Sequence, residues 1–236
     1  MDKQQVIYKD LGLIEYKSAW DYQEELVKNN REIKSANSKQ PADCNRLHTT
    51  NYLLFCEHLP VYTLGKSGSM QNILLSDMEM EEKEIAFFKT NRGGDITFHG
   101  LEQIVGYPII DLEKFYTDIG RYLRELEEVI IKTIAEYGLQ GERSKGETGV
   151  WIEPGVAGRE RKICAMGIRC SRWITMHGFA LNVNTDLSYF NNIIPCGIQN
   201  KQVTSMEKEL NKKVDAAEVK EKLKNNFSKI FNVEII

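Results

Sequence analysis

Apolar residues recur at helical spacing in three stretches of the chain. The clearest is 118–138, and Gly138 is a natural stop for that helix. Residues 18–36 carry a narrower apolar stripe among many charges, which predicts a surface helix. A last helix is expected after Asp215, because Glu218 follows three residues later in the manner of a capping box. The spacing i, i+3, i+4, i+7 in the first stretch is set by Ile119, Tyr122, Leu123, Leu126, Val129, Ile130, Ile134 and Tyr137.

Short apolar runs between these helices predict the strands of a sheet. Pro108 lies inside one of them, and because proline donates no ladder hydrogen bond we expect an edge position or a bulge there. No repeat, low-complexity tract or long linker divides the chain. The pattern predicts a single α+β domain over residues 1–236, with a mixed β-sheet flanked by helices. The runs are 5–8, 51–56, 85–89, 103–110, 149–153, 162–170 and 173–184.

Composition places the chain among soluble globular proteins. Of its 236 residues, 42% are hydrophobic and 28% charged, which is ordinary for that class. The first residues have no apolar signal-peptide core, and no apolar run approaches the roughly 20 residues that span a bilayer. The chain has five cysteines, an odd number, and they are scattered along the sequence, which favours free thiols in a reducing compartment. We therefore expect a cytoplasmic protein with no membrane contact.

Charge narrows the choice of partners. A net charge of -3 argues against nonspecific nucleic-acid binding. Residues 143–172 nevertheless carry a local basic surplus, opposed only by Glu147, Glu153 and Glu160. Such a surface could steer an acidic partner, or its side chains could simply keep a loop soluble. The basic residues are Arg143, Lys145, Arg159, Arg161, Lys162, Arg169 and Arg172.

A cysteine and a lysine are the leading candidates for chemistry. Cys196 lies between Pro195 and Gly197, in a turn that would display its thiol. A nearby ammonium group lowers a thiol pKa and raises the thiolate fraction. The hypothesis is a pair with Cys196 as nucleophile and Lys162 as its activator. The alternative is that Cys196 packs as a small hydrophobic residue and Lys162 is solvated.

Two glycine-containing segments are candidate ligand linings. Residues 91–100 read NRGGDITFHG, in which adjacent glycines allow close backbone approach, although such a pair also marks plain turns. In 162–170, strict alternation places Lys162 on the face opposite Ala165 and Gly167. Either a bulge re-aims one set of side chains, or a ligand meets these small residues through the backbone.

Several common chemistries lack their motifs. The chain has no GxxxxGK[ST] phosphate loop, no GxGxxG and no GxSxG. It also has no CxxC and no HExxH, so no metal site is expected.

Five segments stand in one order along the chain: RGGDITFHG, QIVGYPI, KICAMGIR, HGFALNVN and PCG. Together they resemble the bacterial octanoyltransferases of lipoate biosynthesis, and the upstream EHLPVYTLGKSG is similar to that family's EHxPVYTxG. The resemblance covers about residues 50 to 206. It implies the fold of lipoate-protein and biotin-protein ligases, which is a mixed sheet with helices packed around it.

The resemblance also implies an activity. It implies an enzyme that moves an octanoyl group from octanoyl-acyl-carrier-protein, through a cysteine thioester, to a lysine of lipoyl domains. The acceptors would be 2-oxoacid dehydrogenase E2 subunits and the glycine-cleavage H protein. No cofactor is implied, and we expect a monomer. Three alternatives stay open: an ATP-dependent lipoate ligase, an amidotransferase between lipoyl proteins, and a non-catalytic carrier-binding homologue.

Site residues follow from the resemblance position by position. Cys196 matches the acyl-thioester nucleophile, and Lys162 matches the lysine that lowers its pKa. The family usually has HGPGQ where this chain has HGLEQ, so Leu101 and Glu102 replace a proline and a glycine. That change puts the local turn in doubt. Substrate contacts are implied for Arg92, Gly93, Gly94, Asp95, Ile96, Thr97, Phe98, His99, Ala165, Met166, Gly167, Gly178, Phe179 and Ala180.

Overall fold

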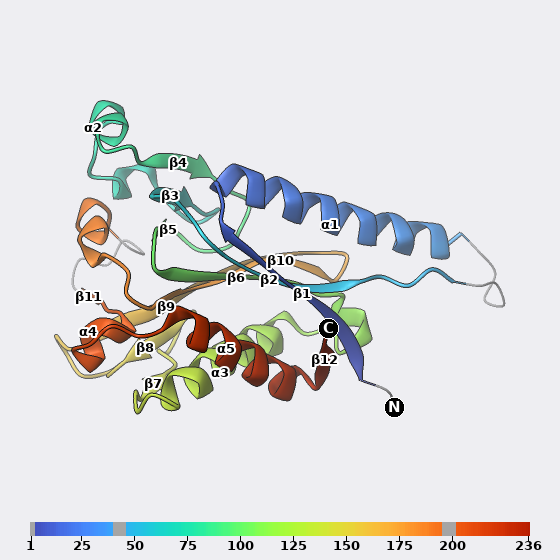
Figure 1. Cartoon of the computed structure of the whole chain (residues 1–236). Coiled ribbons are helices and arrows are strands. Elements are labelled where there is room, and N and C mark those ends of the chain that lie inside the picture. Colours follow the sequence, from blue (N-terminus) through green and yellow to red (C-terminus); the bar gives the residue numbers. More distant parts are fainter. Residues whose placement is uncertain (1–2, 40–45, 195–201) are drawn as a thin grey trace.

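The computed structural model describes residues 3–39, 46–194 and 202–236. A large mixed sheet with strand order β12-β1-β2-β6-β10-β9-β8-β7 forms its centre, and β11 pairs with β9 (Figure 1). β1 is parallel to β2 and β12, and β11 is parallel to β9, whereas the other neighbours are antiparallel. The strands are β1 (Gln4–Leu13), β2 (Asn51–Glu57), β6 (Gln103–Ile109), β7 (Gly141–Glu142), β8 (Val150–Ile152), β9 (Arg161–Ser171), β10 (Ile174–Asn182), β11 (Gln202–Val203) and β12 (Val233–Ile235).

A small second sheet stands over one end of the large one (Figure 1). Its central strand β3 (Val61–Leu64) is parallel to β4 (Ala86–Lys89) and antiparallel to β5 (Ile96–His99). β5 belongs to the candidate loop 91–100. The small sheet therefore positions that loop next to the large sheet.

Helices cover both faces of the large sheet (Figure 1). The upper face, as Figure 1 is drawn, is covered by α1 (Tyr16–Asn37), and the lower face by α3 (Ile119–Ala135) and α5 (Ala216–Phe231). The shorter helical segments are α2 (Asp77–Glu82), α4 (Met206–Leu210), η1 (Met70–Asn72), η2 (Leu112–Lys114) and η3 (Leu187–Asn192).

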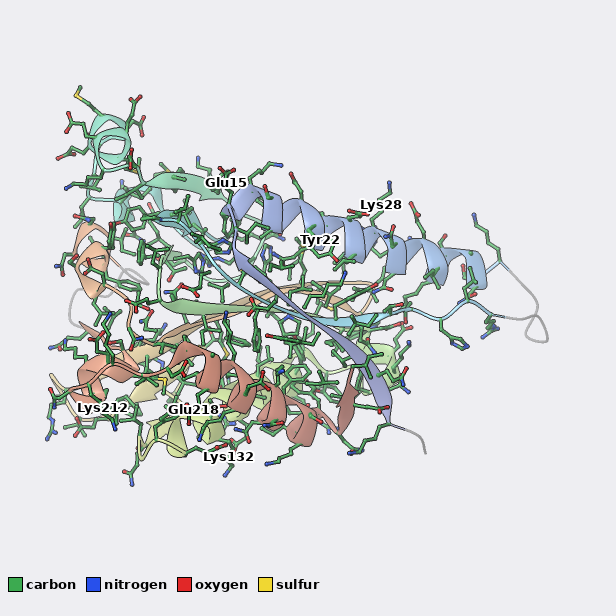
Figure 2. The ribbon with its side chains drawn as sticks, in the orientation of Figure 1. Glu15, Tyr22, Lys28, Lys132, Lys212 and Glu218 are labelled. Atoms are coloured by element: carbon green, nitrogen blue, oxygen red, sulfur yellow. The ribbon has the colours of Figure 1, made fainter. Side chains whose placement is uncertain are left out.

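Helices α3 and α5 begin at side-chain caps, and each buries one stripe of residues. The Asp118 carboxylate accepts the Arg121 N–H at 2.9 Å and opens α3, whose apolar stripe is buried from Tyr122 to Ile134 except for the partly exposed Leu123, whereas Ile119 is exposed. Asp215 caps α5 as expected. Glu218, the expected second member of a capping box, instead forms an ion pair with Lys222 at 3.4 Å. Figure 2 shows Lys132 on the outer side of α3, away from the sheet, where it is 60% exposed.

The predicted fold class is confirmed, with one correction of detail. Pro108 does not lie at an edge, because β6 runs between β2 and β10 in the middle of the sheet. The β6–β10 pairing reaches only Gly106, and the Pro108 ring lies against Gly178. Thr175 Oγ1 donates to the Pro108 carbonyl at 2.8 Å. A side-chain hydrogen bond therefore replaces the backbone hydrogen bonds of the β6–β10 pair at this point.

Candidate functional site

A cavity lies between the small sheet and the upper face of the large sheet. About 90 Å³ of it can hold the centres of water molecules. It mixes apolar with hydrogen-bonding and cationic side chains, as ligand pockets commonly do. The lining comprises Tyr16, Arg92, Gly94, Asp95, Ile96, Thr97, His99, Gln103, Val105, Tyr107, Thr148, Lys162, Ala165, Met166, Gly167, His177, Gly178, Phe179, Ala180, Asn182, Phe190 and Val203.

A shift of register in β9 brings Lys162 to this cavity. Val150 on β8 pairs with Cys164 whereas Trp151 pairs with Lys162, so Ile163 is an extra residue in β9. Ile163 and Cys164 are both fully buried in the core below the sheet. Two successive residues on one face reverse the alternation, and Lys162 therefore shares the upper face with Ala165. The bulge, one of the two alternatives left open by the sequence, is the one that the structure contains.

Two of the predicted segments are direct strand partners. Across β9 and β10, Ala165 pairs with Ala180, Met166 with Phe179 and Gly167 with Gly178. The alanines and glycines form a floor of small side chains that leaves room above the sheet. Met166 and Phe179 turn into the lower core cluster.

The Arg-Gly-Gly loop presses onto that floor through backbone contacts. Gly93 N–H donates to the Ile168 carbonyl at 2.8 Å. A Cβ on Gly167 would lie 2.6 Å from the Gly93 carbonyl oxygen, too close to be accommodated without a shift. Gly94 has φ +84°, a conformation that favours glycine. The glycines at 93, 94 and 167 thus allow this loop to close one side of the cavity.

The Arg92 guanidinium is buried beside the cavity. Its Nη2 donates to the Thr63 carbonyl at 2.5 Å and to Thr63 Oγ1 at 2.9 Å, and Nη1 donates to the Gly93 carbonyl at 3.0 Å. These bonds tie the loop to β3 and keep a positive charge in a dry environment. That charge contributes to the lowered pKa values of His99 and His177.

A chain of hydrogen bonds fixes the orientation of His99. Asn182 Nδ2 donates to the Thr204 carbonyl at 2.9 Å, and Gln103 Nε2 donates to Asn182 Oδ1 at 2.8 Å. Gln103 Oε1 therefore faces His99 Nδ1, 2.9 Å away, and that nitrogen carries the proton. His99 Nε2 is left as an acceptor, 3.3 Å from Thr63 Oγ1.

The three histidines near the cavity are held in the neutral form. Burial lowers the pKa of His99 well below its usual range, and the neighbouring His58 and Arg92 act in the same direction. Burial also lowers the pKa of His58 to about 4 and that of His177 to about 3. His177 Nε2 contacts Asn91 Oδ1 at 2.7 Å, next to Arg92 in the loop.

Lys162 stands at the end of the cavity nearest β11. Its Nζ lies 4.5 Å from the centroid of the Trp151 ring, and Val203 of β11 is its strand partner. A cation over an aromatic face is favourable. Cys196 lies outside the described residues, so the Cys196–Lys162 pair stays a prediction.

Nearly all of the described residues predicted to contact substrate line the cavity. The exceptions are Gly93, which faces the Ile168 carbonyl, and Phe98, which stacks on Tyr189 with ring centroids 4.6 Å apart. Sequence analysis did not single out Tyr16 or Tyr107, which also line the cavity. Their positions in an amphipathic helix and an apolar strand look the same as those of ordinary core residues.

The basic window 143–172 is partly neutralised by distant carboxylates. Arg161 contacts Glu153 and Glu209, each at 2.5 Å, and Arg169 contacts Glu24 at 2.8 Å. Glu24 and Glu209 are far from the window in sequence, so a local count of charges could not show the pairing. The proposed steering surface is therefore weaker at Arg161 and Arg169 than the sequence indicates.

In the described part of the chain, no group of three or more His, Cys, Asp or Glu side chains is arranged to hold a metal ion. No helix there has the length and apolar character needed to cross a bilayer.

Comparison with known proteins agrees with this geometry. A family model described as the lipoyl protein ligase A/B catalytic domain matches residues 15–228. The octanoyltransferase of Flavobacterium johnsoniae is 58% identical over 229 residues, which is 97% of each chain. The structure of lipoate-protein ligase A bound with ATP has a TM-score of 0.66 at 13% identity, covering 100% of this chain and 90% of that one. A bipartite archaeal lipoate protein ligase, described with its E2 lipoyl domain from Thermoplasma acidophilum, gives 0.67 at 17% identity, with 100% and 86% covered.

These matches show the class of protein to which the chain belongs. The fold, with a cavity closed by a Gly-rich loop over paired β-strands, is that of a lipoyl protein ligase A/B catalytic domain. Within that class, the chain belongs to the octanoyltransferase family.

Proposed function

We propose that this chain is an acyltransferase that moves an octanoyl group from octanoyl-acyl-carrier-protein to a lysine of lipoyl domains, through a thioester on Cys196. One observation carries the proposal. A single cavity gathers the Arg-Gly-Gly loop, the paired segments of β9 and β10, and Lys162. The full-length similarity to proteins named octanoyltransferase supports the same activity.

The described thiols are poor candidates for the nucleophile. Burial raises the pKa values of Cys56, Cys164 and Cys170, which favours their unreactive thiol forms. Cys164 also belongs to the core below the sheet, on the side away from the cavity. Cys196 is preferred because it matches the family's nucleophile, and Val203, seven residues further along the chain, pairs with Lys162.

The proposed chemistry has two steps. The Cys196 thiolate attacks the thioester carbonyl of the donor, and the carrier's thiolate leaves and takes up the proton of the Lys162 ammonium group. This step exchanges one thioester for another, so it is close to isoenergetic. The acceptor lysine amine then attacks the acyl-enzyme, Cys196 leaves as thiolate, and an amide forms.

Lys162 would serve both steps. As an ammonium group it stabilises the Cys196 thiolate. As a neutral amine it accepts the proton that the attacking lysine loses. The floor of Ala165, Gly167, Gly178 and Ala180 gives an acyl chain space beside apolar groups such as Val105.

The proposed partners follow from the family. The donor is octanoyl-acyl-carrier-protein, and the acceptors are lipoyl domains of 2-oxoacid dehydrogenase E2 subunits and the glycine-cleavage H protein. An archaeal ligase of the same fold is described with an E2 lipoyl domain, which supports this choice of acceptor. We propose that the enzyme acts as a monomer in the cytoplasm, without a cofactor.

ATP is not required by the proposed reaction, because the donor is already a thioester. In the loop 65–68, which adjoins the Arg-Gly-Gly loop, the backbone N–H groups donate to carbonyl oxygens of the protein itself: Gly65 to Asp95, Lys66 to Arg92, Ser67 to Gly94 and Gly68 to Gly65. These four amides are therefore occupied and do not form a phosphate cradle.

Intact-mass spectrometry tests the proposal. Mixing the protein with octanoyl-carrier protein, without ATP, is expected to add one octanoyl mass that hydroxylamine removes. Cys196→Ser should abolish the adduct and transfer, whereas Cys170→Ser, a half-buried cysteine outside the cavity, should retain both. Transfer by Cys196→Ser at the parental rate would refute the covalent route.

The same measurement, repeated with free octanoate plus ATP and with octanoylated lipoyl protein as the donor, separates the alternatives. An ATP-dependent ligase would need ATP and a free acid and would tolerate loss of Cys196. A carrier-binding homologue would bind the donor and form no adduct. An amidotransferase would take the octanoyl group from octanoylated lipoyl protein in preference to the carrier protein.

A further inference from the structure

An open groove borders the cavity on its β11 side. About 410 Å³ of it can hold the centres of water molecules, against about 90 Å³ in the cavity. Phe190 and Val203 line both spaces, so the groove starts where the cavity ends. The groove is lined by Leu187, Ser188, Phe190, Asn191, Gln202, Val203 and Lys208.

One wall of the groove is the 3-10 segment η3, which is firmly held. Tyr62 OH donates to the Tyr189 carbonyl at 2.7 Å. Phe98 stacks on Tyr189 with an interplanar angle of 5° and meets the edge of Phe190 at 5.5 Å. This wall is therefore preorganised by the same β5 strand that lines the cavity.

The opposite wall is formed by β11 and α4. The Glu209 carboxylate contacts Arg161 through both oxygens, at 2.5 and 2.6 Å, and also accepts from Thr204 Oγ1 at 2.5 Å. Glu207 N–H donates to the Val183 carbonyl at 2.9 Å. These bonds anchor α4 and leave Lys208 exposed at the groove.

The groove's chemistry suits a long, amide-bearing anion. Asn191 and Gln202 offer amide groups, Ser188 a hydroxyl, and Phe190 and Val203 apolar surface. Among its described lining residues Lys208 is the charged one, and no carboxylate is present. The Lys208 ammonium group favours a phosphate and disfavours an incoming lysine ammonium group.

We propose that this groove binds the phosphopantetheine arm of the acyl donor, with Lys208 contacting its phosphate. The thioester end lies toward the cavity, the amides run along Asn191 and Gln202, and the phosphate meets Lys208. The inference rests on the proposed function, because it needs a donor with such an arm. It also implies that the acceptor lysine approaches from another side.

The test compares two small donors that differ by one phosphate, octanoyl-4′-phosphopantetheine and octanoyl-pantetheine. Lys208→Glu is expected to raise the KM for the phosphorylated donor about fivefold at low salt, because an exposed charge contact is modest. The KM for octanoyl-pantetheine and both kcat values should change less than about twofold. The difference should shrink at about 0.5 M salt, where charges are screened.

Lys212→Glu is the matched control. Lys212 is exposed a few residues along the chain and does not line the groove (Figure 2). This variant makes the same change in net charge and should leave both KM values unchanged. Asn191→Ala should raise the KM for both donors alike, since both carry the amides.

The outcomes separate this inference from the proposed function. If the parental enzyme transfers octanoyl from both donors but Lys208→Glu changes neither KM, or changes both equally, the groove does not bind the phosphate. If Lys212→Glu raised the KM for the phosphorylated donor equally, the effect would come from net charge alone, and the assignment of the phosphate to Lys208 would be overturned as well. If the parental enzyme transfers from neither donor nor from octanoyl-carrier protein, the proposed function itself fails.

Discussion

The two faces of the large sheet are built on different principles. Below it, α3 and α5 bury a core of aliphatic and aromatic side chains such as Leu126 and Phe227. Above it, under α1 and the small sheet, the buried groups include Arg92, His99 and His177. The lower face needs close packing, whereas the upper face needs a hydrogen-bond partner for each polar group.

The difference shows where the protein keeps room for chemistry. Polar groups buried without partners are costly, so a fold retains a buried cluster of histidines and an arginine only where they are organised. Here they surround the cavity, and the small side chains of β9 and β10 leave space between them. The lower face holds the larger apolar core, whereas the upper face combines a smaller apolar core under α1 with the site.

The largest expected effect is on the upper face, at Lys162. Lys162→Ala removes the proposed activator and base, so transfer should slow by about 10²–10⁴-fold. The pH midpoint of Cys196 alkylation should also rise. Lys132→Ala, an exposed lysine on α3, is the control and should keep both values. An unchanged alkylation profile in Lys162→Ala would mean that this lysine does not activate the thiol.

On the lower face, Leu126→Ala should reduce stability and leave the site intact. Leu126 is fully buried in the core under the sheet, and such truncations cost about 2–5 kcal/mol of unfolding free energy. Urea denaturation measures the loss. The KM for the donor, measured well below the transition, should stay within about twofold if the faces are independent. Ile119→Ala, at a position 41% exposed, should have little effect on either quantity.

A pH titration of stability tests the buried histidines of the upper face. The folded-state pKa values of His58 and His177 are about 4 and about 3, below the unfolded value near 6.5. Between these values the unfolded chain binds more protons, so stability is complete above about pH 6.5 and falls toward pH 4. The loss should be on the order of a few kcal/mol.

Histidine variants show which residue causes this pH dependence of the unfolding free energy. His58→Gln should make stability depend less on pH in this window, and His48→Gln, at an exposed position, should not. If unfolding free energy between pH 7 and pH 4 were flat in the parental protein, the histidines would not be held neutral by the fold.

The smallest effect concerns Glu102, in the turn before β6. It has φ +58°, in a region that disfavours residues with a side chain. Its N–H donates to Glu57 Oε2 at 2.9 Å and its carbonyl accepts from Asn184 N at 3.1 Å, so the turn is fixed. Glu102→Gly should raise the unfolding free energy by about 1 kcal/mol.

Glu102→Ala is the comparison for that turn. It removes the exposed contact with Lys213 but keeps the unfavourable backbone, so it should not be stabilising. Equal stability of the Gly and Ala variants, measured by thermal unfolding, would show that the turn stores no strain.

Local patterns determined most of the fold. The period of apolar residues predicted α1, α3 and α5 and most strands, because each of these elements buries one face or is buried on both. Asp215 was identified as a cap because capping depends on neighbouring residues alone. The motifs around Arg92 and Lys162 were also readable, since each lies within one short segment.

Tertiary structure decided which distant segments and side chains contact one another. The bulge at Ile163 turns Lys162 to the cavity, and its position depends on the register between β8 and β9. Pro108 is accommodated in a central strand because the Thr175 hydroxyl, from β10, donates a hydrogen bond to the Pro108 carbonyl where the backbone pairing of β6 and β10 has ended. Arg169 is neutralised by Glu24, which is 145 residues away in the chain. Such contacts join segments that are distant in sequence, and local periodicity carries no record of them.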